Sequence, residues 1–294
     1  MTAVDAAVGV GAGVAAGRRS VIRGRRPPRV GLVLAVVTLV LIVAIAVVPG
    51  LFAGGSPTEI ASADALSGPG GAHWFGTDQL GRDVFTRVAH GAGRSLWLGV
   101  SATTLGILGG AVLGLAAALG GRAADSTLMR LADILLALPP LLLALLVMTV
   151  LGSGTLNLTL AVAISTVPGY ARMVRAEALV VRRSGYVEAA VGLGLRRWLL
   201  IGRHILPNTL GPLLVLATVG FGTTLITASG LSFLGFGAEP PTPEWGLLLS
   251  EGRNYLSTAW WIAVFPGAAI TATVIAVNVV GRHVQARYTR RTSR

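Results

Sequence analysis

Residues 186–208 read Tyr-Val-Glu-Ala-Ala-Val-Gly-Leu-Gly-Leu-Arg-Arg-Trp-Leu-Leu-Ile-Gly-Arg-His-Ile-Leu-Pro-Asn. This stretch is the longest charged and aromatic interruption between two strongly apolar runs in the second half of the chain. Such apolar runs are typical of membrane helices, whereas charges are costly inside a bilayer. We therefore expect the stretch to lie outside the membrane and to contact another component. The rest of the chain indicates on which side it lies.

The composition places the chain among membrane proteins. Hydrophobic residues make up 53% of the 294 residues and charged residues 12%, against about 25% charged residues in soluble domains. Cysteine is absent, which excludes disulfides, thiolate metal sites and cysteine nucleophiles. Lysine is absent too, so the chain lacks the phosphate-binding lysine of a P-loop and cannot by itself be a P-loop ATPase.

The basic balance does not indicate nucleic-acid binding. Although the net charge is +12, the arginines flank apolar segments and do not form one basic face, and aromatic residues make up only 6% of the chain. The four histidines are scattered without metal-ligand spacing. We expect no metal site, no catalytic residues and no cofactor on this chain.

Six apolar segments predict transmembrane helices, so the expected fold class is an all-α membrane protein. The predicted spans are Val30–Val48, Ser95–Leu119, Ile134–Leu151, Leu156–Ala171, Thr209–Leu231 and Trp260–Val280. The first run is longer than the usual apolar core of a signal peptide, which favours an uncleaved helix.

Glycine and proline mark special positions within these spans. Gly106, Gly110 and Gly114 recur every four residues, so they share one helix face and allow another helix to approach closely. Pro139-Pro140 near the start of the third span and Pro168-Gly169 near the end of the fourth predict kinks, because proline removes backbone hydrogen bonds.

The distribution of arginine predicts the orientation. If the amino terminus is cytosolic, 20 of the 24 arginines fall in cytosolic segments, and the others are Arg82, Arg87, Arg94 and Arg253. This is a strong positive-inside pattern. Both termini and residues 172–208 are therefore predicted to be cytosolic.

The predicted domain order follows from the spans and their orientation. It is a basic cytosolic tail (1–29), a first transmembrane helix (30–48), an extracytoplasmic segment (49–94), a transmembrane domain of five helices (95–281) that holds the cytosolic loop 172–208, and a second basic cytosolic tail (282–294). Within the extracytoplasmic segment, Thr77 or Asp78 is predicted to cap a short amphipathic helix that leads into the next span.

The cytosolic loop carries a specific pattern, in which Glu188-Ala189-Ala190 is followed by Gly194 and then by Leu206-Pro207. This pattern resembles the EAA loop of bacterial ABC importer permeases, with His204 where isoleucine is usual. In that family two short helices joined near the glycine dock onto the ATPase subunit. The small alanines suit close helix approach, and glycine suits a turn with positive φ. The resemblance implies a contact set of Tyr186, Glu188, Ala189, Ala190, Gly194, Arg197, Leu206 and Pro207.

Three further stretches are similar to the C-type permeases of dipeptide, oligopeptide and nickel importers. They are Gly-Thr-Asp-Gln-Leu-Gly-Arg-Asp at 76–83, Arg-Leu-Ala-Asp-Ile-Leu-Leu-Ala-Leu-Pro at 130–139, and Leu-Ser-Phe-Leu-Gly-Phe-Gly at 231–237 with Pro240 to Gly246. The first gives an extracytoplasmic signature of Gly76, Thr77, Asp78, Gly81, Arg82 and Asp83. Two uses stay open for it: contact with a binding protein or closure of the pore, and a purely structural cap.

By this resemblance the chain has the type I permease fold, lies in the cell membrane and forms one half of a heterodimeric pore. The implied partners are a homologous B-type permease, one or two ATPase subunits that bind ATP and Mg, an extracytoplasmic substrate-binding protein and membrane lipid. The implied cargo is a di- or oligopeptide, with nickel or another small solute as the alternative.

Several roles remain alternatives at this point. Glu188 is either an ATPase contact, which the motif favours, or a solvated surface carboxylate. Arg196, Arg197 and Arg203 either contact the ATPase or interact with anionic lipid. Asp133 is expected to pair with Arg130 or with a neighbouring helix. An ion-coupled transporter or an intramembrane enzyme is disfavoured, because the six spans contain no Asp, Glu, Arg or His.

Overall fold

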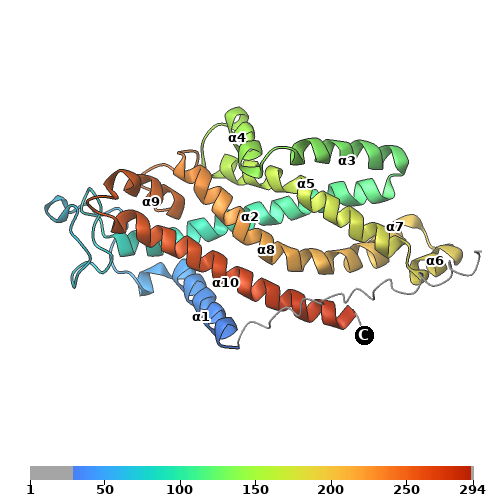
Figure 1. The fold of residues 1–294 in the computed structure, drawn as a ribbon, viewed down its shortest axis with the longest axis horizontal. Coiled ribbons are helices and arrows are strands. Elements are labelled where there is room, and N and C mark those ends of the chain that lie inside the picture. The colour runs from blue at the N-terminus through green and yellow to red at the C-terminus, as the bar shows by residue number, and fades with distance from the viewer. Residues whose placement is uncertain (1–28, 293–294) are drawn as a thin grey trace, which may run out of the picture.

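The computed structural model describes residues 29–292, and in this part of the chain it is helical, with no strand (Figure 1). Most of basic tail 1–29 and the last residues of the second tail lie outside the described residues. The five longer helices are α1 (Arg29–Val47), α2 (Val84–Leu119), α5 (Thr155–Arg182), α8 (Leu206–Phe233) and α10 (Trp261–Thr292). The shorter ones are α3 (Arg122–Leu136), α4 (Pro140–Leu151), α6 (Gly185–Gly192), α7 (Arg197–Leu200) and α9 (Trp245–Gly252).

Membrane-spanning character is clear for four of the long helices. By length and hydropathy α1, α2, α8 and α10 could each cross a bilayer, and a bent pair of helices, α3 and α4, raises the number to five in the described part of the chain. The predicted fourth span lies in α5, but its apolar part is interrupted by polar residues such as Asn157 and by Pro168-Gly169. The count of six spans therefore stays a prediction.

The third predicted span is broken. The sequence predicts one kinked helix over Ile134–Leu151, but α3 ends at Leu136, α4 begins at Pro140, and the two meet at 97°. The cause is local, because a residue before proline is driven out of the helical region, and Pro139 is extended with φ −54° and ψ 137°. Pro140 then suits the first turn of α4, where its missing N–H has no helical partner to lose.

The start of α2 also differs from the prediction. The helix begins at Val84 and not at Ser95, and it runs without a break from the predicted extracytoplasmic segment into the span. Its amino-terminal cap is Asp83, whose Oδ1 accepts a hydrogen bond from the Thr86 backbone N–H at 2.7 Å. The predicted caps, Thr77 and Asp78, precede it in the loop and have other partners.

The glycine stripe of α2 faces α5, the helix that runs beside it in the same direction along most of its length (Figure 1). A Cβ atom at Gly106 would lie 2.2 Å from Thr166 Oγ1, one at Gly110 would lie 2.3 Å from Tyr170 Cβ, and one at Gly114 would lie 2.5 Å from the Ala171 carbonyl oxygen. None of these distances leaves room for a methyl group. The α2–α5 contact therefore depends on the missing side chains.

Gly110→Ala should destabilise the protein by about 1–3 kcal/mol, since the new methyl group must push α5 away from α2. The matched control is Gly169→Ala on α5, where a Cβ would meet nothing within 4 Å beyond its own stretch of helix and alanine favours the helix. Thermal unfolding of the two variants in detergent measures the difference. Equal melting temperatures would show that the helices do not pack through this face.

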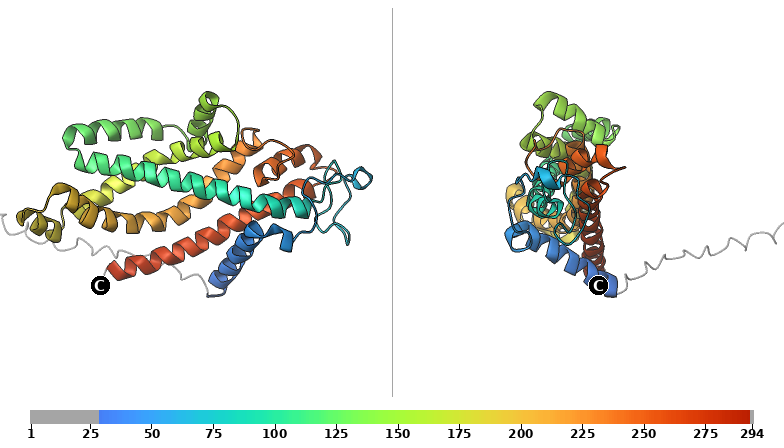
Figure 2. Two further views of the ribbon diagram at one scale, coloured as in Figure 1. Left: turned by 180° about the vertical axis from the view of Figure 1, so that it is seen from behind. Right: turned by 90° about the vertical axis from the view of Figure 1, so that its left-hand side faces the viewer.

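The molecule is elongated, and its two ends carry different structures (Figures 1 and 2). One end holds residues 48–83 together with α9, which we call the cap. The other end holds α6 and α7, which we call the 186–207 loop after the motif that it contains. Each end has its own buried apolar cluster. One joins Trp245 of the cap to Trp261 and Ile262 at the start of α10, and the other lies around Val187, Leu200 and Ile205 in the loop.

Candidate functional site

The 186–207 loop forms two short helices joined by a turn at Gly194. Helix α6 ends in a glycine-type cap, in which the Gly194 N–H donates to the Val191 carbonyl at 2.9 Å and the Leu195 N–H donates to the Ala190 carbonyl at 3.1 Å. Gly194 has φ +77°, a conformation that L side chains rarely adopt. Helix α7 follows, and a π-helical turn at Ile201–Ile205 joins it to α8.

One side of this loop is anchored to the helix bundle. Val187, Leu200 and Ile205 are buried against Ala118 of α2 and Ala178 of α5. A pocket of about 590 Å³ opens beside this anchor. It is lined by Leu119, Arg182, Val187, Val191, Leu195, Leu200, Ile201 and Ile205. The loop is therefore held by apolar contacts on one side only.

The other side of the loop is exposed and unusually apolar. Leu193 beside the turn is 88% exposed and Trp198 of α7 is 65% exposed, and Tyr186 is also exposed. Large exposed apolar groups that lie together mark interaction surfaces. The loop therefore offers a partner exposed apolar side chains on both sides of Gly194 in the sequence.

The remaining motif residues take defined places around the turn. Ala189 is exposed on α6, Ala190 is half-buried, and Leu206 and Pro207 begin α8. Glu188 lies in α6 and Arg197 begins α7, but their side chains lie outside the described part of the chain. His204, the departure from the usual motif, lies in the π-helical turn, and its ring centroid is 6.2 Å from that of Tyr186.

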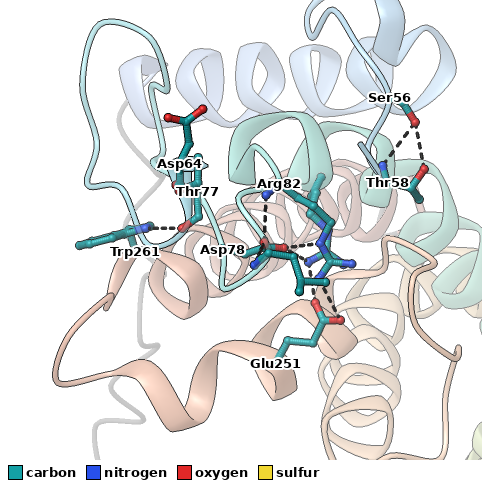
Figure 3. A network of polar contacts seen from close by, with 10 residues as sticks. Ser56, Thr58, Asp64, Thr77, Asp78, Arg82, Glu251 and Trp261 are labelled. Atoms are coloured by element: carbon teal, nitrogen blue, oxygen red, sulfur yellow. Dashed lines mark hydrogen bonds and ion pairs between the residues drawn. The ribbon is translucent and has the colours of Figure 1, made fainter. Parts of the chain in front are cut away.

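The extracytoplasmic signature forms a buried ion-pair cluster inside the cap. Asp78 is fully buried, and its Oδ2 accepts from Arg82 Nε at 2.6 Å and from Arg87 Nη1 at 2.8 Å. Arg87 Nη1 also donates to Glu251 Oε2 at 2.6 Å, and Arg82 Nη2 lies 3.5 Å from Glu251 Oε1. Figure 3 shows the Asp78 and Glu251 carboxylates converging on the arginines from the loop and from the end of α9. Two acids and two bases balance, so the cluster is neutral as a whole.

The backbone around Asp78 is shaped to fit this cluster. The N–H groups of Leu80 and Arg82 donate to Asp78 Oδ1 at 2.8 and 3.0 Å. Gly81 has φ +75°, and a Cβ there would lie 1.8 Å from the Ala61 carbonyl oxygen. Only glycine fits at this position, because both the conformation and the space exclude a side chain.

Thr77 and Gly76 attach the signature to the start of α10. Trp261 Nε1 donates to the Thr77 carbonyl at 2.9 Å (Figure 3). The Thr77 hydroxyl donates to the Asp64 carbonyl and accepts from the Ser67 N–H at 2.8 Å. Gly76 has φ +71°, and a Cβ there would lie 2.6 Å from Trp261 Nε1. The signature thus ties the loop to α2, α9 and α10 at once.

Asp83 has a second contact besides its cap of α2, because its Oδ2 lies 2.9 Å from His73 Nδ1. Both residues line an open pocket of about 330 Å³ at the surface of the cap. Its other lining residues are Phe52, Ala53, Gly54, Ala72, Trp74, Phe85 and Thr86. The pocket is mainly aromatic and polar, and it lies beside the ion-pair cluster without including Asp78 or Arg87.

Two acidic residues of the cap were not singled out from the sequence. Glu251 closes the ion-pair cluster, and Glu244 is buried at the start of α9. Glu244 accepts from the N–H groups of Gly246 and Leu247 at 2.8 and 2.9 Å and from the hydroxyls of Ser95 and Ser232. Glutamate is not one of the usual amino-terminal cap residues, and its partner Ser95 lies 149 positions away, so the sequence gives little sign of this role.

Ion pairs also tie α3 to α5. Asp133 pairs with Arg172 of the neighbouring helix and not with Arg130, and Asp125 pairs with Arg175, with Arg175 Nη2 donating to Asp125 Oδ2 at 2.6 Å. The Asp133–Arg172 pair matches the expectation that Asp133 pairs with a neighbouring helix. The Asp125–Arg175 pair was not predicted from the sequence. Among residues 29–292, no cluster of three or more acidic or histidine side chains is arranged to hold a metal ion.

Relatives of known description were found by sequence. Residues 110–294 match the family described as "Binding-protein-dependent transport system inner membrane component". The chain is 41% identical to a dipeptide transport system permease protein, DppC, of Alkalihalophilus pseudofirmus, over 84% of this chain and 83% of the relative. It is 43% identical to a probable D,D-dipeptide transport system permease protein, DdpC, of Escherichia coli (76% of each chain). A glutathione transport system permease protein, GsiD, of Pectobacterium atrosepticum is also 43% identical (73% of this chain and 71% of the relative).

Solved structures agree on the fold. An inward-facing structure of the MetNI methionine ABC transporter includes a chain that aligns with a TM-score of 0.55 and 18% identity, covering 68% of this chain and 95% of that one. A transporter described as an amino acid ABC transporter with histidines aligns with a TM-score of 0.51 and 18% identity, covering 70% of this chain and 94% of that one. At these identities the likeness concerns the fold. The family, in contrast, is shown by the sequence match, which covers more than half of the chain. The protein is a multi-pass protein of the inner membrane and belongs to the family of binding-protein-dependent transport system inner membrane components.

Proposed function

We propose that this chain is the permease subunit of an ATP-driven importer of di- or oligopeptides. It forms one half of the translocation pathway and takes its driving force from separate ATPase subunits, which bind ATP and Mg. The relatives named above are described as permease proteins of transport systems for dipeptides, for D,D-dipeptides (as a probable function) and for glutathione, and this favours a peptide over nickel or another small solute.

The observation that carries the proposal is the exposed turn at Gly194. It presents Leu193 and Trp198 to solvent at the end of the molecule opposite the cap, on a frame anchored to α2 and α5 (Figure 2). An ATPase that binds these exposed side chains would transmit its movement through α5 and α8, which adjoin the loop at its two ends. With the arginine distribution as the guide to orientation, the loop and both termini face the cytosol and the cap faces outward.

The remaining partners follow from the same proposal. A homologous B-type permease completes the pathway, and a substrate-binding protein delivers the peptide to the cap side. The apolar faces of α1 and of the other spanning helices meet lipid or the second permease. Arg197 and Glu188 of the loop contact the ATPase, and the arginines near the membrane surface also attract anionic lipid.

Uptake by the assembled transporter in proteoliposomes tests this function. Transport of a labelled dipeptide should need ATP and stop with vanadate, and a protonophore should leave it unchanged. An excess of unlabelled dipeptide should compete, whereas Ni²⁺ should not. Uptake that persists without any ATPase subunit would contradict the proposal and favour an ion-coupled transporter.

A further inference from the structure

The cap is tied to α2 by two independent groups of polar contacts, one at each end of α9. At the start of α9, Glu244 is bonded to Ser95 of α2, and Ser95 Oγ accepts from the Trp245 N–H at 3.0 Å. At the far end, Glu251 holds Arg87 of α2. Helix α9 is therefore fixed to α2 at both of its ends and not at one point.

Close backbone contacts reinforce both ties. Trp245 Nε1 donates to the Val88 carbonyl of α2 at 2.9 Å. A Cβ at Gly91 would lie 3.3 Å from Trp245 Cδ1, and a Cβ at Gly246 would lie 2.6 Å from the Ser229 carbonyl of α8. Packing this tight is disturbed by small displacements. Sliding of α9 along α2 or α8 would meet steric overlap at once.

The buried charges oppose the separation of α9 from α2 even more strongly than the packing does. Asp78 and Arg87 are almost completely buried, and Glu251 is only 11% exposed. Pulling α9 away from α2 would leave Arg87 with Asp78 alone and take the Glu251 carboxylate from both of its arginines. Breaking a buried pair is strongly unfavourable because each charge has given up its hydration. While the cap stays closed, each of these charges keeps its partners.

We propose that the cap, the first turns of α2 and the start of α10 form one rigid block, whose internal contacts stay intact through the transport cycle. In this subunit the outward-facing end then opens by moving α2 and α9 together, and α9 does not act as a separate lid. The inference rests on the proposed function, because it concerns a cycle driven by ATP. It assigns the signature residues Asp78 and Arg82 a positioning role inside the block.

Distance measurements between spin labels test the block, and the absence of cysteine from this chain allows labels at chosen sites. Arg94 on α2, Ala63 in the loop and Asn254 after α9 are all exposed. The pairs Arg94→Cys with Asn254→Cys and Ala63→Cys with Asn254→Cys report on the block. A label at Asn254→Cys and one on the outer surface of the second permease report on the cycle. The distance between the labels of each pair is measured in the assembled transporter, first without nucleotide and then after trapping with ATP and vanadate.

The block predicts that both pairs within this chain keep the same distance in the two states while the pair between the permeases shifts. A shift of the Arg94–Asn254 distance together with the pair between the permeases would overturn the inference and leave the proposed function intact. No shift of any pair on trapping would contradict the ATP-driven cycle, and the inference would fall with it.

A variant shows whether the ion pairs hold the block. Glu251→Gln should broaden the Arg94–Asn254 distance distribution, since the neutral amide cannot balance Arg87. The matched control is Glu239→Gln, which changes an exposed glutamate ahead of α9. A distribution that stays equally narrow in both variants would show that the cluster does not hold α9 to α2, and would overturn this part of the inference.

Discussion

Asp78→Ala is expected to destabilise the cap by about 3–5 kcal/mol, the usual cost of removing one partner from a buried ion pair. The Asp78 carboxylate accepts from Arg82, from Arg87 and from two backbone N–H groups. Without it two buried guanidinium groups share only Glu251. Thermal unfolding of the purified protein in detergent, followed by circular dichroism, measures the loss.

Asp64→Ala is the control, because that side chain is exposed and the hydrogen bonds of Asp64 in the cap use its backbone N–H and carbonyl groups, which alanine keeps. It should unfold like the unmodified protein. A double variant separates the effect of charge from that of size. Asp78→Ala combined with Arg87→Met should lose less stability than the sum of the losses in the two single variants, because the second change removes one of the unpaired charges. Full additivity, or an Asp78→Ala melting curve equal to that of Asp64→Ala, would contradict the cluster.

Gly194→Pro should abolish transport while the protein still inserts into the membrane. Proline holds φ near −65°, whereas Gly194 has φ +77°, and proline also removes the N–H that donates to the Val191 carbonyl. The observed turn should be disfavoured by about 3 kcal/mol, a depopulation of roughly 100-fold. Peptide uptake and copurification of the ATPase subunit are the measurements, and Glu188→Arg should impair the same two properties.

The control for this prediction is Gly192→Ala in the same loop. Gly192 has open space around it like Gly194 but no positive φ, so the methyl group should be tolerated. Transport that survives both Gly194→Pro and Glu188→Arg, with the ATPase still bound, would show that the 186–207 loop does not couple the subunits.

Several features can be predicted because they depend on neighbouring residues. The sequence places helix α1 within a residue of its observed bounds, since a run of Val, Leu and Ile without charges has one favourable place, the bilayer. The turn at Gly194 is expected at that position, because glycine alone adopts positive φ without strain. The prolines at 139 and 140 predict a kink, but not that it becomes a break of 97°.

Other features needed the fold, because their partners are distant in sequence. Arg87 and Glu251 are separated by 164 positions, and Trp261 and Thr77 by 184. Nothing local distinguishes Glu251 from the exposed Glu239. The prediction of Thr77 or Asp78 as the cap of α2, in place of Asp83, is wrong for a related reason, since their own long-range bonds, which the sequence does not show, engage them elsewhere.

The sequence alone determined that this chain is a helical membrane protein, the approximate position of its apolar helices and the family to which it belongs. These follow from composition, periodicity and short motifs, which act over a few residues and need no folded partner. The tertiary structure alone decided which charges are buried together, that α9 is held to α2 at both ends, and which helix receives the glycine stripe of α2. These features arise where segments that are distant in sequence pack together. There the packing partner, and not the residue itself, determines what it costs to bury a charge and whether a methyl group has room.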